Sequence, residues 1–297
     1  MVGRLLLSFF IFNLDKTATF LFVKPIYLPL FVLWLLSCEQ QPERLFSVVP
    51  ADESGVSFAN TIVENEQYNV FDYHNVYNGG GVGIADLNND GLPDLYFTGN
   101  MVNDKIYLNK GDFRFEDITK KTGIISGGWS TGVTMVDINN DGLMDIYVSK
   151  SGNEPGEKRA NQLYVNQGDF TFTEEASIYG IADTSYTNQA AFFDYDKDGD
   201  LDLYLLNTSN LIRNANLLRK PINDGSGYAT DKLYRNDNEK FNEVTISAGI
   251  LTNGHGLGLA VGDVNNDGWE DILASSDFLP NDALYINNQD GTFTDRG

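Results

Sequence analysis

Residues 86–94 read DLNNDGLPD, and this stretch decides which fold the chain can adopt. Three carboxylates fall within nine residues, between the apolar runs GGGVGIA (79–85) and LYFTG (95–99). Carboxylates packed this closely repel one another unless a cation lies among them. Gly91 permits the left-handed backbone that a tight turn needs. The stretch is therefore predicted to be a cation-binding loop between two short strands.

The same pattern returns three times, as DINNDGLMD, DYDKDGDLD and DVNNDGWED, which gives the common form D-x-[DN]-x-D-G-x-x-D. We number these stretches loops 1 to 4, and they cover residues 86–94, 137–145, 194–202 and 263–271. Each loop follows a glycine-rich or apolar run and precedes an alternating one, as strands require. The loops begin 51, 57 and 69 residues apart, so the chain is built from internal repeats.

A second shared segment follows each loop, with the sequences IYLNKGDFRFEDI, LYVNQGDFTFTEE, LYRNDNEKFNEV and LYINNQDGTFTD. Each reads as a β-hairpin, because two β-rich runs flank an Asn/Gly/Asp turn. A unit then holds four short strands, with the acidic loop between the first two. Four-stranded units at this spacing are typical of β-propeller blades. We predict an all-β fold with four such blades.

The loops offer only oxygen ligands, which favours calcium over zinc or copper. We expect side-chain ligands at loop positions one, three, five and nine and a main-chain carbonyl at position seven, with about four ions in all. The predicted residues are Asp86, Asn88, Asp90, Leu92 and Asp94; Asp137, Asn139, Asp141, Leu143 and Asp145; Asp194, Asp196, Asp198, Asp200 and Asp202; and Asp263, Asn265, Asp267, Trp269 and Asp271.

Two other interpretations of the loops were weighed. An EF-hand needs a bidentate Glu at position twelve, but Phe97, Val148, Leu205 and Ala274 stand there, which excludes it. Metal-free Asn/Asp/Gly hairpin turns are the second alternative. Such turns need only one or two of these residues, and each loop has more, so calcium is favoured.

The repeated loops, each with a glycine-rich strand before it and an LYxN…F hairpin after it, resemble the FG-GAP/VCBS repeats of integrin-α-type propellers. The segments YNGGGVGIADLNNDGLPDLYFTGN and AAFFDYDKDGDLDLYLLN are especially similar to the cartilage-acidic-protein-like lipoproteins of bacteria. The resemblance covers residues 44–297. It implies a seven-bladed propeller with calcium in the loops, in proteins linked to adhesion, ligand binding or polymer handling at the cell surface.

The first 38 residues differ from the rest, with basic residues ahead of an apolar run too short to span a bilayer comfortably. The run ends in LLSC, which resembles a bacterial lipobox, so Cys38 is the expected lipidation site. An uncleaved anchor with a free thiol is the alternative. The predicted organisation is a lipoprotein signal peptide at 1–38, a polar tether at 39–43 and the propeller at 44–297.

Residues 46–56 look like a diverged copy of a blade's fourth strand and its exit, as if the N-terminus supplied strand four of another blade. Four complete blades leave that strand without partners. We therefore expect a C-terminally truncated part of a seven-bladed propeller, with a self-closed four-bladed ring as the alternative. Residues 207–231 form an insertion in the third unit, and a tolerated surface loop is as reasonable an interpretation as a functional one.

The net charge of −22 argues against nucleic acid as a partner. His74 and His255 lie just before first strands in different units, and we interpret them as locally hydrogen-bonded loop residues. Trp129, Tyr77 and Tyr186 could stack on sugars, although blade packing is the simpler role. The glycine clusters match no nucleotide motif and are interpreted as small residues where inner strands converge.

The sequence thus predicts a calcium-stabilised, non-enzymatic binding, adhesion or scaffold module at the bacterial cell surface. It would be exported and held on the membrane, expected to be the outer one, only by its N-terminal lipid. Its ligand would be a protein or a polysaccharide. The alternative function is a propeller-type carbohydrate-active enzyme, either a polysaccharide lyase or a hydrolase.

Overall fold

The computed structural model describes residues 45–153, 155–209, 222–277 and 281–297. The chain divides into two units, 1–48 and 49–297, and the four blades lie in the second. The predicted signal peptide, Cys38 and the tether lie outside the described residues, as does most of the 207–231 insertion. Among the helices that are described, none has the length and apolar character needed to cross a membrane.

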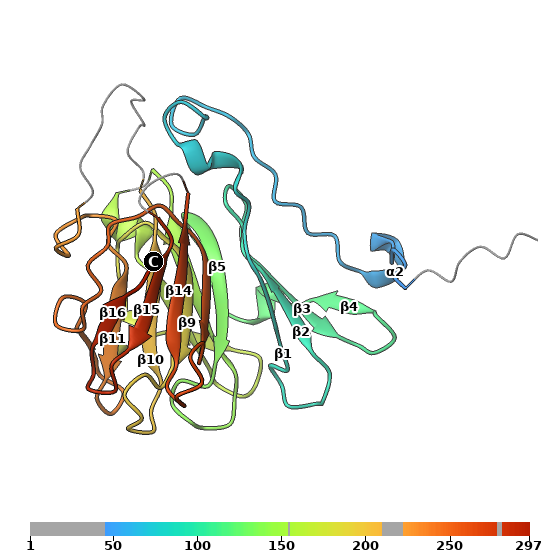
Figure 1. The fold of residues 1–297 in the computed structure, drawn as a ribbon. Helices are drawn as coiled ribbons and strands as arrows, with labels where there is room; N and C mark the ends of the chain where they lie inside the picture. The colour runs from blue at the N-terminus through green and yellow to red at the C-terminus, as the bar shows by residue number, and fades with distance from the viewer. Residues whose placement is uncertain (1–44, 154, 210–221, 278–280) are drawn as a thin grey trace, which may run out of the picture. The chain divides into compact units, whose positions relative to one another are not determined.

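The second unit contains four antiparallel sheets of four strands each, which confirms the predicted fold class (Figure 1). The strands of blade 1 are β1 (Val82–Ala85), β2 (Asp94–Phe97), β3 (Lys105–Asn109) and β4 (Phe115–Asp117). Those of blade 2 are β5 (Trp129–Val136), β6 (Asp145–Ser151), β7 (Gln162–Asn166) and β8 (Phe172–Glu174).

Blade 3 consists of β9 (Thr187–Phe193), β10 (Asp202–Asn207), β11 (Lys232–Asn236) and β12 (Phe241–Glu243). Blade 4 consists of β13 (Gly256–Gly262), β14 (Asp271–Ser276), β15 (Ala283–Asn287) and β16 (Phe293–Asp295). The short helices are α2 (Ala51–Ser54), η1 (His74–Tyr77), η2 (Thr119–Lys121), η3 (Gly156–Arg159) and α3 (Ala176–Tyr179).

Within each blade the strands follow one another in chain order, so the acidic loop joins the first strand to the second, as predicted. The register ends at the loop in all four blades. In blade 1, Ala85 pairs with Asp94, and in blade 2, Val136 pairs with Asp145. The last residue of the first strand and the ninth loop residue therefore face each other across the base of the loop.

Neighbouring blades are joined through their first strands. The amide of Gly81 donates to the carbonyl of Thr131 (2.7 Å), and the Thr131 hydroxyl donates to the carbonyl of Thr187 (2.7 Å). A Cβ at Gly132 would lie 2.5 Å from the carbonyl oxygen of Asn188, so the chains approach too closely for a larger residue. Gly81, which belongs to the first of the two predicted glycine clusters, is also close to the next blade, since a Cβ there would lie 3.0 Å from the Thr131 carbonyl oxygen.

Apolar side chains fill the space between consecutive blades. Ile106 and Leu108 of blade 1 pack with Ile146 and Tyr164 of blade 2 in one buried cluster. Similar clusters join blade 2 to blade 3 and blade 3 to blade 4. Full burial of such a side chain contributes about 1.5–3 kcal/mol. Each blade is therefore stabilised mainly by its neighbours, as in other repeat proteins.

The exits from the fourth strands of blades 1 to 3 each end in a left-handed glycine, Gly123, Gly180 or Gly249, that lies against the fourth strand of the next blade. A Cβ at Gly123 would face the carbonyl of Phe172, and one at Gly180 that of Phe241. Gly55, after α2, lies in the same way over Phe115. The prediction for the exit half of 46–56 is thus confirmed. Its strand half stays a prediction, because residues 46–50 form no strand among the described residues and the blade that they would complete is not one of the four.

A polar residue precedes the third strand in every blade, and it is buried in blades 1 to 3. Its side chain accepts a hydrogen bond from the main-chain amide at the end of the second strand, which closes the corner opposite the acidic loop. The pairs are Asp104 with Gly99 (2.8 Å), Asn161 with Lys150 (2.8 Å), Asp231 with Asn207 (2.7 Å) and Asp282 with Ser276 (2.8 Å).

Blades 1 and 2 share a buried ionic network at this corner. Lys150 is 1% exposed, and its Nζ donates to the Ser130 hydroxyl (2.7 Å) and to the Gly127 carbonyl (2.8 Å). Ser130 in turn donates to Asp104 (3.1 Å). Burial raises the pKa of Asp104 and lowers that of Lys150, whereas the opposite charge of each partner works against both shifts.

Blade 3 has the same corner without a lysine. Asp231 accepts hydrogen bonds from the Tyr204 hydroxyl (2.7 Å) and the Asn207 amide (2.7 Å). Burial raises its pKa to about 7, because these two neutral donors compensate only part of the cost of removing a carboxylate from water. Asp231 is therefore an ionisable group inside the molecule that titrates near neutral pH.

Candidate metal centre

The first Asp of each loop organises the turn around its own carboxylate. In loop 1, Asp86 accepts hydrogen bonds from the amides of Asp90 (3.1 Å) and Gly91 (2.7 Å). Asp137, Asp194 and Asp263 accept the equivalent pair of amides in their loops. Gly91 has φ of 86°, where a side chain would be strained. The D-x-x-x-D-G part of the motif thus has a local structural reason.

The ninth-position Asp is buried and ties the loop to the third strand. In loop 2, Asp145 is 0% exposed and accepts from the amides of Ile138 (3.0 Å) and Asn166 (2.8 Å). The same two bonds recur in the other three blades at Asp94, Asp202 and Asp271. One carboxylate therefore fixes the loop, the start of the second strand and the end of the third.

The Asn that ends the third strand adds a link between blades. Asn166 of blade 2 donates through Nδ2 to the carbonyl of Leu87 (2.9 Å), which lies in loop 1 of blade 1. Asn287 of blade 4 donates to the carbonyl of Tyr195 (2.8 Å) in loop 3 of blade 3. These loops are thus held by the following blade as well as by their own.

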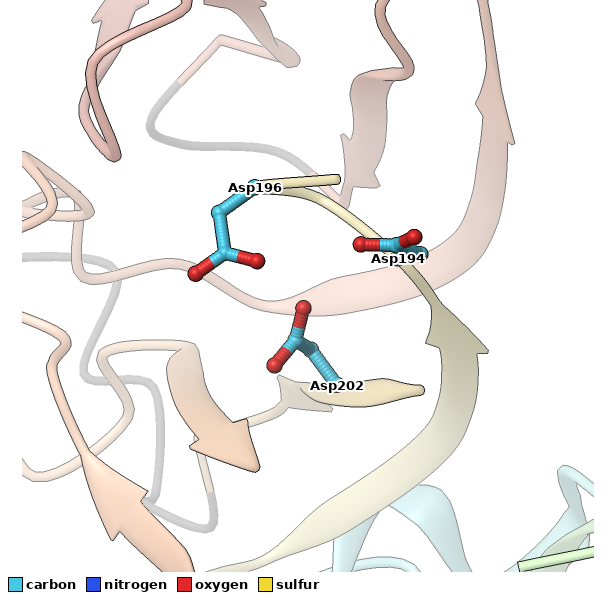
Figure 2. Close-up of side chains that lie close together, drawn as sticks. All are labelled: Asp194, Asp196 and Asp202. Carbon is cyan, nitrogen blue, oxygen red and sulfur yellow. The ribbon is translucent and has the colours of Figure 1, made fainter. Parts of the chain in front are cut away.

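Loop 3 brings three carboxylates together. Oxygens of Asp194, Asp196 and Asp202 lie within 4.8 Å of one another, and Figure 2 shows the three groups turned toward a common space. Burial, assisted by the negative charges of Asp196 and Asp198, raises the pKa of Asp202 to about 8. One oxygen each of Asp196 and Asp200 is buried without a hydrogen-bond partner in the protein.

These features fit a hard divalent cation. Buried carboxylate oxygens without donors are costly unless a positive charge or a donor satisfies them. Calcium, when bound, would supply that charge, held by the oxygens of Asp194, Asp196 and Asp202. Asp198 and Asp200 do not belong to the group of three. Asp198 instead accepts from the amide of Asp200 (3.2 Å).

Loops 1, 2 and 4 carry an amide at position three, and its NH₂ group donates to the fifth-position carboxylate. The pairs are Asn88 with Asp90, Asn139 with Asp141 and Asn265 with Asp267, each at 2.9 Å. Within the residues that can be described, a group of three carboxylates therefore forms in loop 3 alone. Burial again raises the pKa of the ninth residue in loops 1 and 2, to about 6 at Asp145.

In each loop the main-chain amide of the seventh residue donates a hydrogen bond to the carboxylate of the fifth residue. The amides of Leu92, Leu143 and Trp269 donate to Asp90, Asp141 and Asp267 at 2.9, 2.8 and 2.9 Å. The predicted ligands of every loop thus lie on one short turn. Calcium ligation by their oxygens stays a prediction at all twenty positions.

The remaining candidate residues have separate local roles. His74 lies in η1 and His255 directly before β13, in blades 1 and 4 as expected. Trp129 is 2% exposed and stacks on Tyr68 with ring centroids 4.6 Å apart. Arg159 lies over the ring of Tyr186 at 4.0 Å, and Tyr77 donates to Glu64 (2.6 Å). Trp129 is therefore a packing residue.

Sequence reasoning missed two contributors to the loops and corners. The third-strand Asn was visible in the repeated LYxN but was interpreted only as part of a hairpin. The polar residue two positions before each LY or IY pair was also visible, as Asp104, Asn161, Asp231 and Asp282. Repetition was the signal in both cases, since a position without a structural role would not need the same chemistry four times.

The repeats can now be compared with known proteins. A family model described as FG-GAP-like repeat matches residues 86–148, 152–205 and 222–274, which is more than half of the chain. The chain belongs to the FG-GAP-like repeat family. The first matched segment of this FG-GAP-like chain begins at loop 1, the other two begin after the second strand of a blade, and all three end in the second strand of the next blade, so the family unit is offset from the structural blade.

A curated relative of this FG-GAP-like chain is cartilage acidic protein 1 of Xenopus tropicalis, with 26% identity over 205 residues. The match covers 68% of the chain but only 29% of the relative, so the chain spans less than a third of that protein. The similarity therefore concerns the repeats and leaves the rest of the relative unmatched.

Two solved structures share part of the arrangement at 15% identity. One is the biofilm matrix protein Bap1 of V. cholerae, with a TM-score of 0.36 over 72% of this chain and 27% of that one. The other is an Agrocybe aegerita lectin that recognises non-reducing terminal N-acetylglucosamine, with a TM-score of 0.30 over 72% of this chain and 64% of that one.

Proposed function

We propose that this FG-GAP-like chain is a calcium-stabilised binding module that acts in adhesion or as a scaffold at the bacterial cell surface. The observation that carries the calcium part is loop 3, where three carboxylates converge and one oxygen of Asp196 has no donor. The observation behind the binding role is the rigid, repeat-built β scaffold, which exposes loops at the ends of its blades.

Calcium would act on the structure and not on a reaction. Every acidic loop lies at the junction of three strands, and loops 1 and 3 are also held by the following blade. A cation that neutralises the charge of a loop would therefore strengthen the junction of the three strands at that loop and, in loops 1 and 3, the contact with the following blade. Its binding to the native state alone raises stability by mass action.

Export and anchoring are proposed from the first 38 residues. An LLSC sequence after an apolar run supports acylation at Cys38 and retention on the outer membrane. Cys38→Ala should release the chain from the membrane fraction of expressing cells, whereas Cys38 in the wild-type chain should keep it there. Equal membrane retention of both forms would contradict lipid anchoring.

The binding role is tested on whole cells. Cells that display the chain should adhere to polysaccharide-coated surfaces or to cells of the same strain better than cells that lack it. A calcium chelator should remove the difference, and added calcium should restore it. Adhesion that is the same with and without the chain would contradict the proposal.

The enzymatic alternative needs a different measurement. Polysaccharides incubated with the purified chain are assayed for new reducing ends and for the unsaturated products of a lyase. Turnover that disappears in His74→Ala or His255→Ala, with melting temperature unchanged, would replace the binding role by catalysis. We expect no turnover, because the two histidines lie in different blades.

A further inference from the structure

A groove of about 400 Å³ opens between blades 3 and 4 on the side of the acidic loops. It is lined by residues from loops 3 and 4, by Arg235 of β11 and by the turn before β16. Pockets that bind small molecules start at roughly 300 Å³, so one sugar unit would fit. The equivalent space between blades 1 and 2 is filled by a buried apolar cluster.

The groove exists because one aromatic side chain is missing. In blade 2, Phe170 occupies the turn between the third and fourth strands and packs against the cluster between blades 1 and 2. Gly291 stands at the same position of blade 4 and lines the groove. A Cβ at Gly291 would have no heavy atom within 4 Å. The backbone is the same, with φ of 67° at Phe170 and 82° at Gly291.

Other departures from the repeat gather at the same place. Arg235 stands where blades 1 and 2 have the buried Leu108 and Val165. Trp269 occupies the seventh position of loop 4, where loops 1 and 2 have leucine, and it also lines the groove. Asp196 replaces the asparagine found at position three of the other loops.

Together these substitutions convert a filled apolar contact into a polar groove with an aromatic wall. Trp269 is half-buried, and Lys197 Nζ lies 4.3 Å from its ring centroid, which holds the ring in place. Arg235 uses two N–H groups on Asp237 (3.1 and 3.0 Å), and a guanidinium carries five. Donors, acceptors and an apolar plane therefore face one space.

This combination matches the surface of a pyranose ring. A sugar presents an apolar face of C–H groups, which packs on an indole, and a rim of hydroxyls that both donate and accept hydrogen bonds. Nucleic acid is disfavoured by the net charge of −22. A purely apolar ligand would displace water from the N–H groups of Arg235 that do not bond Asp237 and would offer them no replacement.

We propose that the groove between blades 3 and 4 is a carbohydrate-binding site, with Trp269 as stacking platform and Arg235 and Asp196 as hydroxyl ligands. This site rests on the proposed binding function, for which it names the ligand class. The four departures from the repeat would then be its specificity residues.

The repeat supplies substitutions that keep the fold. Gly291→Phe copies Phe170 and should fill the groove, and Trp269→Leu copies Leu143 and keeps the main chain of loop 4. Phe113→Leu is the matched control, because Phe113 holds the same turn position in blade 1 and is 73% exposed. Melting temperatures in calcium establish that all three variants are folded.

Binding is measured by saturation-transfer NMR on the full chain in calcium. The probes are methyl glycosides of glucose, galactose, mannose, N-acetylglucosamine and glucuronic acid. At least one should bind, and its affinity should fall in Gly291→Phe and Trp269→Leu by up to about tenfold, since loss of a stacking contact is worth roughly two- to tenfold. Phe113→Leu should bind as the wild-type chain does.

Two outcomes would overturn the site. Binding that persists unchanged in both groove variants places the sugar elsewhere and leaves the binding function standing. Absence of binding for every glycoside removes carbohydrate as the ligand class, while the adhesion of displaying cells still decides the proposed function. If the groove variants abolish glycoside binding but displaying cells do not adhere, the carbohydrate site stands and only the proposed cellular role is contradicted.

Discussion

Asp231 should make the stability of the chain depend on pH in a way that a single amide substitution removes. Its carboxyl is 7% exposed, and burial raises its pKa from 3.8 to about 7. The folded state therefore binds this proton more tightly than the unfolded state does. The stabilisation is fully present below pH 3.8 and is lost as the pH rises through about 7.

The size of the effect follows from the shift. A difference of about three pH units, at roughly 1.4 kcal/mol each, gives on the order of 4 kcal/mol between pH 4 and pH 8. Asp231→Asn stays neutral throughout this range. Asn161 occupies the same corner in blade 2 and accepts the equivalent main-chain bond at 2.8 Å, so an amide is compatible with the site.

The stability curves of the two proteins should cross. At pH 4 to 5 Asp231→Asn should be less stable by about 1 kcal/mol, because the Tyr204 hydroxyl loses its acceptor. At pH 8 it should be more stable by about 3 kcal/mol, because no carboxyl must ionise inside the molecule. The assay is urea unfolding followed by tryptophan fluorescence, at a fixed calcium excess.

The loop carboxylates titrate in both proteins, so their contribution cancels in the difference between the two. A control is Asp104→Asn at the equivalent corner of blade 1, where Lys150 supplies a positive charge. That variant should be less stable than the wild-type chain at pH 8, which is the opposite sign. A constant difference between Asp231→Asn and the wild-type chain from pH 4 to pH 8 would refute the reasoning.

Three further predictions concern the loops and the blade contacts. Chelation of calcium should lower the melting temperature, because an ion present at one hundred times its dissociation constant contributes about 2.7 kcal/mol. An unchanged melting temperature would contradict a structural role. Asp196→Asn should weaken calcium binding at loop 3, measured by calorimetry. Lys150→Met should cost about 3–5 kcal/mol in urea unfolding by leaving Asp104 buried without its partner, and the double variant with Asp104→Asn should recover part of it; strictly additive losses would show that the two residues do not interact. Asn166→Ala should cost about 1–3 kcal/mol and speed amide exchange in loop 1, whereas Asn109→Ala, which gives up a bond to Pro93 within its own blade, should leave exchange in the other loops unchanged.

The strands and loops could be predicted because their determinants are local. Period-two apolar runs and Asn/Asp/Gly turns identified all sixteen strands, and nine residues were enough to locate each loop. The strand expected at residues 46–50 stays a prediction, because it is not formed among the described residues. The sequence of this segment resembles a fourth strand, but a strand needs a hydrogen-bonded neighbour, and composition does not show whether one is present.

The contacts between blades could not be predicted in the same way. Lys150 ends an alternating strand, where a lysine is normally solvated, and only the folded structure places it beside Ser130. Loop 3 was predicted like the other loops, although its third-position aspartate alone completes a group of three carboxylates. Gly291 is an ordinary turn glycine by sequence. Only the structure shows that Phe170, at the same position of blade 2, packs between blades 1 and 2, where Gly291 leaves a groove between blades 3 and 4.

The side-chain amide of Asn166 connects loop 1 of blade 1 to the third strand of blade 2. Loss of metal from loop 1 would therefore weaken the hydrogen bond that joins blade 2 to it, and loop 3 and blade 4 form a second pair of this kind. Thermal unfolding of the four blades should then become less cooperative when a single acidic loop in the middle of the array is weakened, even though most of the contacts between blades are intact.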